Sequence, residues 1–204
     1  MGKIIKEIVI ASHNEGKVKE IRSLLKPLGF QIYSAKKFQI NEPVENGKTF
    51  NENSLIKSKN AALKSGLPAI ADDSGLCILS LNNQPGIYSA RWAGSSKNFE
   101  LAISKIEKKM AKSKLFNKGS RKAFFCCSLS LYFPNHCYRV FEGRKYGHVQ
   151  FPASGKNGFG YDPIFVPIGY KKTFGEMDFN YKERISHRAI AFKKMKKYLL
   201  SIKN

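Results

Sequence analysis

Apolar runs and amphipathic stretches alternate along the first third of the chain and predict strands and helices in turn. Residues 4–11 are largely apolar and predict a strand, whereas residues 18–27 space their apolar side chains as one face of a helix does. Residues 32–40 are ambiguous and fit a second strand followed by a loop. A helix is expected after Thr49, and the short apolar run at 69–71 predicts a buried strand. The order β, α, β, α, β predicts an α/β sheet.

The two predicted helices carry boundary signals. Pro27 and Gly29 are expected to end the first helix. Thr49 is the expected N-cap of the second helix, and Glu52, three residues later, completes a capping box. The apolar side of this second helix is expected to consist of Leu55, Ile56, Ala62 and Leu63.

The second half of the chain adds a helix and several β-rich runs. Residues 84–94 are loop-like, and apolar residues at helical spacing over 99–110 predict a helix. The runs 123–133 and 137–141 flank a Pro-Asn turn and predict a long hairpin. Residues 146–151 are expected to add another strand.

The final helix is predicted to open within residues 182–188, with Ser186 as its N-cap. His187 and Arg188 then lie in the first turn, where positive charge opposes the helix dipole. Arg188 is therefore better suited to binding an anion or a polar ligand than to stabilising the helix. The inner face of the helix is expected to consist of Ala191, Met195, Tyr198, Leu199 and Ile202.

The length and composition fit a single globular domain. The chain has 204 residues, of which 42% are apolar, so it can bury a substantial core, and it shows no internal repeat or clear linker. We expect one domain over residues 1–204. No apolar run approaches the ~18 residues of a membrane span. The N-terminus mixes charge into its apolar run and is interpreted as a first strand, not a signal peptide, so a cytoplasmic protein without membrane partners is expected.

Cysteine and histidine spacing gives no sign of a disulfide framework or a zinc site. The cysteines are not in C-x-x-C spacing, and two are adjacent in an apolar run, which predicts reduced core thiols in a cytosolic protein. No H-x-x-x-H pattern exists, so zinc is not expected. The residues concerned are Cys77, Cys126, Cys127, Cys137, His13, His136, His148 and His187.

The formal net charge of +21 favours a polyanionic partner such as nucleic acid, an acidic membrane or a phosphorylated small molecule. The lysines are nevertheless dispersed, with a basic connection at 112–121 and the densest group at 193–197. A nucleic-acid-binding module would instead cluster basic residues with interleaved aromatic residues. Lysine as a general surface residue is therefore favoured, and nucleic acid is not an expected partner.

A polar loop at residues 12–17 connects the first strand to the first helix. This arrangement directs backbone N–H groups and the positive end of a helix at an anion, and Asn14 and Lys17 would add a donor and a charge. It is not a Walker A loop, because Val18 follows the Gly-Lys pair where Ser or Thr is required. An ordinary strand-to-helix loop remains the alternative.

Two adjacent carboxylates, Asp72 and Asp73, follow the apolar run at 69–71 and precede Ser74 and Gly75. Charged aspartates are rarely buried without a partner. Neighbouring side chains on a strand point to opposite faces, so only one of the two faces any given cleft if the strand continues to Asp73. The other would then hold the turn. A simple polar turn after the strand is the alternative.

A glycine-rich patch at residues 155–165 surrounds Phe159 and ends in Tyr161, Asp162 and a proline. Glycine permits close backbone approach and positive φ. An exposed aromatic ring between glycines is suited to stacking on a flat ligand ring. A β-turn with core aromatic residues explains the patch equally well.

Six motifs occur in an order that resembles one known family. They are SHNEGK (12–17), ENGKTF (45–50), DDSG (72–75), PGIYSAR (85–91), GFGYDPIF (158–165) and SHR (186–188). Each motif is weak alone, but the six together resemble the inosine/xanthosine triphosphate pyrophosphatase family (RdgB-like, or ITPase). The resemblance extends from about Ile8 to Leu199 and covers nearly the whole chain.

The resemblance implies an α/β fold with a long central mixed sheet flanked by helices, and two lobes with the active-site cleft between them. Members of the family are usually homodimers. They hydrolyse deaminated purine nucleoside triphosphates (ITP, dITP, XTP) to the monophosphate and pyrophosphate with Mg²⁺, which cleanses the nucleotide pool.

The resemblance also implies roles for individual residues. Glu45 and Asp73 match the Mg²⁺ carboxylates, and Asp73 matches the residue that positions or deprotonates the attacking water. Residues 12–17 match the triphosphate cradle, namely Ser12, His13, Asn14, Glu15, Gly16 and Lys17. The remaining matched substrate contacts are Ser74, Phe159, Gly160, Tyr161, Asp162, Lys182, His187 and Arg188, with Phe159 stacking on the purine.

Two other functions compete with this one. A Maf-like nucleotide pyrophosphatase with another base preference would share the phosphate chemistry, but the motifs at 158–165 and 186–188 argue against it. A basic nucleic-acid-binding protein would have to accommodate carboxylates at 45, 72 and 73, which repel a phosphate backbone. Strand alternation does not say whether Asp72 or Asp73 faces the cleft. Only the family match assigns the base to Asp73.

Overall fold

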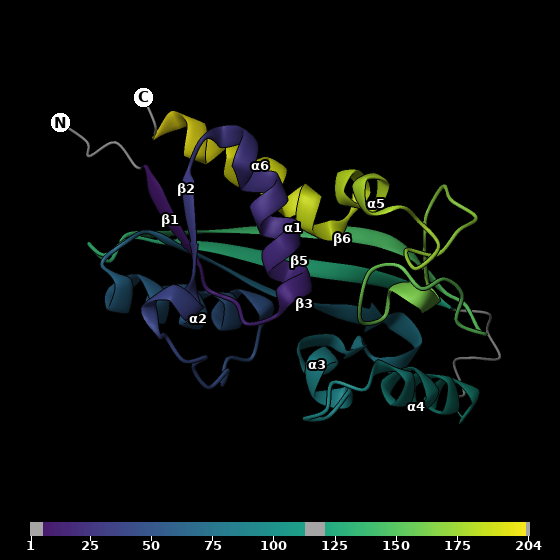
Figure 1. Cartoon of the computed structure of the whole chain (residues 1–204). Coiled ribbons are helices and arrows are strands. Elements are labelled where there is room, and N and C mark those ends of the chain that lie inside the picture. Colours follow the sequence, from purple (N-terminus) through teal and green to yellow (C-terminus); the bar gives the residue numbers. More distant parts are fainter. Residues whose placement is uncertain (1–5, 113–120, 203–204) are drawn as a thin grey trace. The chain divides into compact units, whose positions relative to one another are not determined.

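The computed structural model describes residues 6–112 and 121–202. Its strands form a seven-stranded sheet with the order β2-β1-β3-β5-β6-β7, in which β4 pairs with β3 (Figure 1). β1 is parallel to β2 and β3, whereas β3–β4 and β6–β7 are antiparallel, which confirms the expected mixed sheet. The strands are β1 (Glu7–Ile10), β2 (Gln31–Ser34), β3 (Ala69–Ile78), β4 (Gln84–Pro85), β5 (Lys122–Tyr132), β6 (Tyr138–Val149) and β7 (Phe165–Pro167).

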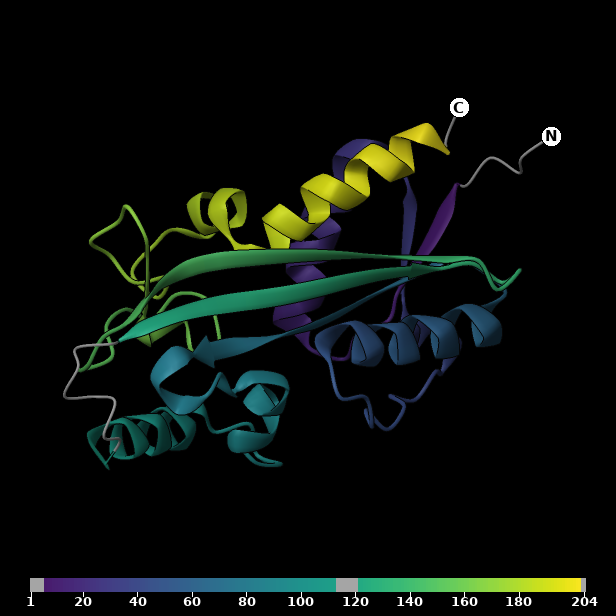
Figure 2. The ribbon, with the colours of Figure 1, turned by 180° about the vertical axis from the view of Figure 1, so that it is seen from behind.

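α1 and α2 alternate with the first three strands, and the later helices fall into two groups, α3 and α4 before β5, and α5 and α6 after β7. Figure 2 shows the ribbon from behind. The α-helices are α1 (Glu15–Leu25), α2 (Phe50–Ser65), α3 (Ser89–Trp92), α4 (Phe99–Lys112), α5 (Phe179–Ile185) and α6 (His187–Ser201). Short 3-10 turns are η1 (Lys26–Leu28), η2 (Ala35–Phe38), η3 (Leu79–Leu81), η4 (Gly86–Tyr88) and η6 (Asp162–Ile164). The predicted order β, α, β, α, β is therefore confirmed.

The chain divides into two compact units. The first contains Met1–Asp73, Cys127–Gly143 and Arg188–Asn204, and the second contains Ser74–Cys126 and Arg144–His187. The boundaries fall inside β3, β5 and β6, and after the first residue of α6. The organisation of residues 1–204 as a single domain stays a prediction.

In the first unit, the strands separate two sets of core side chains. Ile8, Ile10 and Ile70 pack with α1 and α6, whereas Val9 and Ala71 belong to the cluster that packs against α2. This alternation follows from the two-residue period of a strand. It predicts that Asp72 faces α1 and α6, and that Asp73 faces α2.

The buried side of α2 is polar, so the prediction of an apolar face formed by Leu55, Ile56, Ala62 and Leu63 is wrong. Of these four residues only Ala62 is fully buried, and Leu63 is 46% exposed. The buried positions are Asn53, Ser54, Lys57, Ser58, Ala61 and Ala62. The reason is that α2 faces serines of β5 and the carboxylate of Asp73, which require hydrogen-bonding partners instead of apolar ones.

Two serine pairs join α2 to β5 in the first unit. The Oγ atoms of Ser54 and Ser128 are 2.9 Å apart, and Ser130 Oγ donates to Ser58 Oγ at 2.8 Å. All four residues are fully buried. Small hydroxyl side chains let the helix approach the strand closely while each buried hydroxyl still has a partner.

The second unit has its own aromatic core. Leu76 and Ile78 of β3 pack with Ala102, Ile106 and Met110 of α4, and the helix predicted over 99–110 is confirmed. Phe165 lies 4.8 Å from Phe125 and 5.2 Å from Phe174, measured between ring centroids. The residues singled out at 155–165 lie in this unit.

Several predicted element boundaries are corrected. α1 begins at Glu15, so Glu15–Lys17 are helical and not part of the loop. The final helix, α6, begins at His187 directly after Ser186 as predicted, but Ser186 also ends a separate helix, α5, as its C-cap in an extended conformation. Lys182 therefore lies on α5 and not on the final helix. The final helix retains the predicted inner face, since Ala191, Met195 and Leu199 are buried.

The β-rich runs also differ in detail. β3 continues through Asp72–Gly75 to Ile78, so the alternative of a polar turn at this point is wrong.

β5 and β6 form the predicted hairpin, closed by a 2.9 Å hydrogen bond from Phe133 N to Cys137 O. The strand expected at 146–151 is the continuation of β6. Residues 84–94 contain β4, η4 and α3 instead of a loop. Most of the basic connection at 112–121 lies outside the described residues.

Cysteine chemistry and membrane propensity were two further expectations. All four cysteines are free, and Cys77, Cys126 and Cys127 are buried as predicted, whereas Cys137 is exposed at the hairpin and is not a core thiol. Within residues 6–112 and 121–202, no helix combines the length and the apolar character that crossing a bilayer requires.

Candidate active site

Residues 12–17 comprise the end of the loop after β1 and the first turn of α1. Asn14 is the N-cap, and its Oδ1 accepts a 3.1 Å hydrogen bond from Lys17 N. Asn14 N in turn donates to Ser12 Oγ at 3.2 Å. These local bonds fix the loop, and the first turn of the helix presents its positive end there. The arrangement suits an anion such as a phosphate group.

Two other residues of this segment, Glu15 and His13, point to different surroundings. Glu15 points to solvent and pairs with Lys36 at 2.6 Å, and both side chains are mostly exposed. The hydrogen bond and the charge of Lys36 lower the pKa of Glu15. His13 lines a hollow of about 10 Å³ together with Ile40 and Lys57. Glu15 therefore pairs with Lys36 in solvent and is separate from the buried carboxylates of Asp72 and Asp73.

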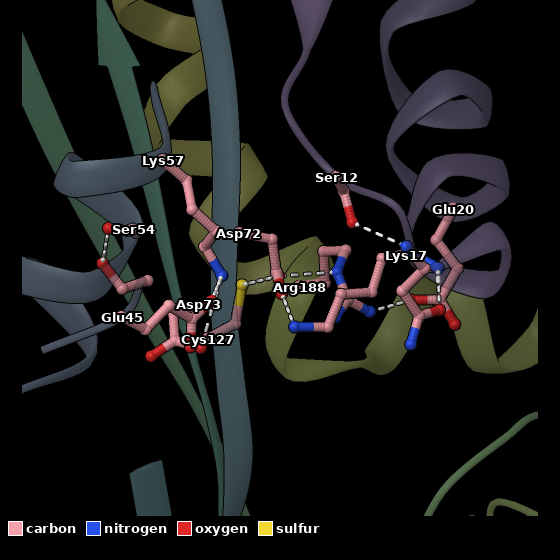
Figure 3. Close-up of polar contacts among 12 residues, drawn as sticks. Ser12, Lys17, Glu20, Glu45, Ser54, Lys57, Asp72, Asp73, Cys127 and Arg188 are labelled. Atoms are coloured by element: carbon pink, nitrogen blue, oxygen red, sulfur yellow. Dashed lines mark hydrogen bonds and ion pairs between the residues drawn. The ribbon is translucent and has the colours of Figure 1, made fainter. Parts of the chain in front are cut away.

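Asp72 is fully buried on the α1 and α6 side of β3, as the strand alternation requires (Figure 3). Its Oδ1 lies 2.5 Å from Lys17 Nζ, and its Oδ2 accepts bonds from Arg188 Nε at 2.9 Å and Cys127 Sγ at 3.0 Å. Burial alone would raise the pKa of Asp72, but the charge of Lys17 and the hydrogen bonds from Cys127 and Lys17 lower it below its ordinary value. Asp72 is therefore a permanent buried anion at neutral pH.

Arg188 connects Asp72 to a second buried carboxylate. Its Nη1 atom contacts Glu20 Oε2 from α1, and both side chains are at most 2% exposed. Burial lowers the pKa of Arg188 to about 9, which leaves the guanidinium charged at neutral pH. Two carboxylates from different elements thus neutralise Arg188 and Lys17, and this network ties α1 and α6 to β3.

Asp73 faces the opposite side of β3, toward α2. Lys57 Nζ lies 2.5 Å from Glu45 Oε1 and 3.6 Å from Asp73 Oδ1, and the side chains of Lys57 and Asp73 are 5% and 8% exposed. Burial raises the pKa of Asp73, and the negative charges of Glu45 and Asp72 add to this, whereas Lys57 and Lys17 oppose it. Burial lowers the pKa of Lys57, but Asp73 and Glu45 outweigh it, so the pKa is raised. A carboxylate with a raised pKa is suited to accept a proton.

The loop that carries Glu45 is fixed to α2. Gly47 N donates to Asn53 Oδ1 at 2.9 Å, and Lys48 N donates to Glu52 Oε2 at 2.6 Å. A side chain at Gly47 would place its Cβ 2.7 Å from Asn53 Oδ1, so glycine is required for this close approach. Glu52 bonds Lys48 N instead of the N-cap nitrogen expected for a capping box, while Thr49 caps α2 as predicted.

The residues Glu45 and Asp73 fit a hard divalent cation. No group of three His, Cys, Asp or Glu residues lies close enough to hold a metal within the described parts of the chain. Mg²⁺, however, usually takes only one or two carboxylates and completes its shell with phosphate oxygens and waters. A single cation, the Lys57 ammonium, already contacts both carboxylates, which shows that they converge on one positive charge.

A second polar cluster lies within the second unit. Lys182 Nζ bonds Asp162 Oδ2 at 2.6 Å, and both side chains are 3% exposed. The same oxygen accepts a 2.8 Å bond from Phe159 N, and Lys182 Nζ lies 4.8 Å from the centroid of the Phe159 ring. Burial raises the pKa of Asp162, and Lys182 and the Phe159 bond oppose this. The structure thus brings Phe159, Asp162 and Lys182 together, as predicted.

Glycine is essential to this turn at Gly158. Its φ is +75°, and a Cβ there would lie 2.1 Å from Asp162 Oδ2. The remaining predicted residues of this unit have other surroundings. Tyr161 is 2% exposed and its hydroxyl donates to Ser89 O at 2.9 Å, while burial raises its pKa. The His187 ring stacks on Phe125 at 4.7 Å between centroids. Ser74 lies on β3 and Gly160 has a φ of +69°.

Three residues of the first cluster were not identified from the sequence: Glu20, Lys57 and Cys127. Glu20 and Lys57 lie in helices for which only the apolar residues were expected to face the core. A usable signal existed for Lys57, because Asn53, Lys57 and Ala61 are spaced by four and form one stripe with Ser54 and Ser58. A stripe of small polar residues around one lysine indicates a buried polar face. Glu20 and Cys127 carried no comparable signal.

Comparison with known proteins gives the relatives of this chain. A dITP/XTP pyrophosphatase of Zymomonas mobilis is 44% identical over 92% of this chain and 89% of its own, and one of Caulobacter vibrioides is 47% identical over 93% and 96%. The solved structure of a HAM1 protein from Coxiella burnetii is 36% identical and superimposes with a TM-score of 0.87, covering 97% of this chain and 100% of that one. A model of the Ham1 family matches residues 8–198. The resemblance drawn from the six motifs is confirmed, and the chain belongs to the Ham1 family.

Proposed function

We propose that this protein hydrolyses deaminated purine nucleoside triphosphates (dITP, ITP and XTP) to the nucleoside monophosphate and pyrophosphate. The observation that carries the proposal is the separation of two consecutive aspartates. Asp72 is enclosed by Lys17 and Arg188, whereas Asp73 shares one cation with Glu45. The relatives named dITP/XTP pyrophosphatase, which are 42–47% identical over most of the chain, support the choice of substrate.

Asp73 is the proposed general base. Its raised pKa, caused first by burial, allows its carboxylate to take a proton from the attacking water. The water oxygen bonds to phosphorus, the anhydride bond to the pyrophosphate group breaks, and pyrophosphate leaves with the bonding electron pair. Asp72 is unsuited to this step because Lys17, Arg188 and Cys127 hold it as a buried anion.

Triphosphate binding is assigned to residues 12–17. The N-terminal end of α1 supplies backbone N–H groups and Lys17 supplies a charge, while Asp72 positions the Lys17 side chain. Glu45 and Asp73 are the proposed holders of Mg²⁺, which would neutralise phosphate charge when bound. Phosphoryl transfer depends mainly on such positioning and charge neutralisation.

Base recognition is assigned to the second cluster. Phe159 offers a ring for stacking, and Lys182 supplies a donor for the 6-oxo group of hypoxanthine or xanthine. Adenine carries an amino donor at the same position, so polar groups of the protein would remain unpaired with ATP. Ser74, Gly160, Tyr161, His187 and Arg188 stay predicted substrate contacts. A homodimer acting on the cytoplasmic nucleotide pool completes the proposal.

The test is pyrophosphate release from dITP, XTP, ATP and dGTP, each measured with Mg²⁺ and with EDTA. We expect dITP and XTP to exceed ATP by about 100-fold in kcat/KM and to require Mg²⁺. Glu45→Gln should lose this turnover, whereas Glu42→Gln, an exposed neighbour in the same loop, should retain it. Equal turnover of all four nucleotides would disprove base selection, and absence of turnover would disprove the function.

A further inference from the structure

Lys57 occupies an unusual position for a lysine. Its side chain is 5% exposed, and its ammonium lies 2.5 Å from Glu45 and 3.6 Å from Asp73, the two carboxylates suited to a divalent cation (Figure 3). Lysine is rarely buried unless it is paired. Here it lies where the two carboxylates converge, so it neutralises them in the absence of any metal ion.

The surrounding structure holds these three groups together. Lys57 projects from α2, and the Glu45 loop is tied to the same helix by the hydrogen bond from Gly47 N to Asn53 Oδ1. Asp73 belongs to β3, which packs against α2 through Ala69 and Ala71. The ion-pair cluster is therefore fixed on both sides and does not depend on flexible surface side chains.

A divalent cation and the Lys57 ammonium cannot both occupy the space between the carboxylates. Mg²⁺ requires oxygen ligands at about 2.0–2.1 Å in octahedral geometry, and a lysine has no lone pair to offer while it is charged. The two cations would also repel each other in a site that is mostly shielded from water. Metal binding must therefore move the Lys57 ammonium away from Glu45 or Asp73.

We propose that Lys57 is a positioning residue that reserves the metal site: its ammonium holds Glu45 and Asp73 in place in the metal-free protein and competes with the incoming divalent cation. The inference rests on the proposed function for the identity of the two metal carboxylates. It predicts that the protein binds divalent metal weakly in the absence of nucleotide. It also predicts that a substitution that removes the positive charge of Lys57 strengthens this metal binding.

The experiment measures Mn²⁺ binding to the nucleotide-free protein by electron paramagnetic resonance. Lys57→Met keeps the length of the side chain and removes the charge, and Lys64→Met in the last turn of α2 is the control. We expect Lys57→Met to bind Mn²⁺ at least about tenfold more tightly than wild type, a change equal to one decade in the dissociation constant, with Lys64→Met unchanged. An unchanged or weaker affinity in Lys57→Met would overturn the proposal.

A second measurement uses the wild-type protein alone, because Lys57→Met could fail to fold with the buried Asp73 and the partly buried Glu45 left without their shared cation. Reductive methylation followed by mass spectrometry reports how accessible each lysine is. We expect Mg²⁺ to increase the labelling of Lys57 and to leave Lys64 unchanged. If Mg²⁺ leaves Lys57 equally protected or protects it further, the ammonium is not displaced and the proposal fails.

These outcomes are separable from failure of the proposed function. Wild-type turnover of dITP with Mg²⁺, combined with unchanged Mn²⁺ affinity in Lys57→Met, would retain the pyrophosphatase and reject the competition. Tighter Mn²⁺ binding in Lys57→Met, combined with no turnover of any nucleotide by wild type, would retain the competition and reject the pyrophosphatase.

Discussion

Asp72 and Asp73 are consecutive residues of β3, yet their carboxylates lie on opposite faces of the sheet and contact different cations. Asp72 binds Lys17 and Arg188 on the side of α1 and α6, and Asp73 lies 3.6 Å from Lys57 on the side of α2. The physical origin is the two-residue period of a strand. Their opposite pKa shifts follow from these surroundings, so substitutions of the two residues should have different effects on stability and on its pH dependence.

Asp72→Asn should destabilise the protein strongly. The change leaves the buried Arg188 and Lys17 without one of their counter-charges, and breaking a buried ion pair typically costs about 3–5 kcal/mol in the free energy of unfolding. Urea denaturation at pH 7 in EDTA measures this difference. A loss below about 1 kcal/mol would place Asp72 among ordinary surface pairs and contradict the network described above.

Lowering the pH should reduce the free energy of unfolding by protonating Asp72. Its folded-state pKa lies below the ordinary value of 3.8, so its contribution to stability is present above that pH and is lost as the pH falls through the folded-state pKa. Asp72→Asn cannot titrate there. We therefore expect the free energy of unfolding to fall less steeply below pH 3.8 in the variant than in wild type, as measured by denaturant titrations at successive pH values.

Asp73→Asn should have the opposite pH signature. The folded-state pKa of Asp73 is raised, so its charge opposes folding once the pH has risen through that pKa. We expect Asp73→Asn in EDTA to be at least as stable as wild type at pH 7 and equal to it below pH 3.8, while pyrophosphate release is abolished. A variant that loses stability as much as Asp72→Asn would show that Asp73 is a structural anion instead of a base.

Glu20→Gln and Glu15→Gln provide a matched pair on α1. Glu20 is buried against Arg188, so its neutralisation should lower the free energy of unfolding by about 3 kcal/mol. Glu15 pairs with Lys36 in solvent, and its neutralisation should produce no measurable loss. Thermal unfolding of both variants in one buffer compares them directly. Equal melting temperatures would show that the Arg188–Glu20 contact contributes little.

Gly158→Ala and Gly66→Ala separate backbone strain from steric exclusion. Both glycines have positive φ, which costs about 1–2 kcal/mol for an alanine. At Gly66 nothing lies within 4 Å of the added Cβ, whereas at Gly158 the Cβ would lie 2.1 Å from Asp162 Oδ2. We expect the larger loss of stability at Gly158, together with a reduced preference for XTP over ATP. An unchanged preference in Gly158→Ala would remove the second cluster from base recognition.

The order of elements was predictable because periodicity and capping residues are local signals. Thr49 begins α2 as its capping pattern predicted, whereas Asn14 begins α1 ahead of the predicted start at residue 18. The buried face of α2 was not predictable from apolar spacing, because Asn53, Ser54 and Lys57 are buried by partners distant in the sequence. Periodicity detects apolar faces and overlooks a face that is buried through hydrogen bonds and ion pairs.

The candidate site was predictable to the level of its motifs and no further. The residue types at 12–17 and 158–165 indicated phosphate binding and ring stacking, whereas the metal role of Glu45 and Asp73 came from the family resemblance. The pairing of Arg188 with Glu20, or of Lys57 with Glu45, depends on which elements meet in space, and a single sequence does not encode that as a local pattern. The choice between Asp72 and Asp73 likewise needed the position of the lysines on either side of β3.

The alternation along β3 has a consequence for assembly of the sheet. A slip of β3 by one residue against β1 would exchange the two faces, so that Asp72 met the serines and lysine of α2 while Asp73 met the guanidinium of Arg188. The apolar neighbours Ile70 and Ala71 would exchange faces as well and leave a large side chain where a small one fits. The two aspartates thus also fix the register of β3, because their different charged partners on the two faces disfavour a misaligned strand.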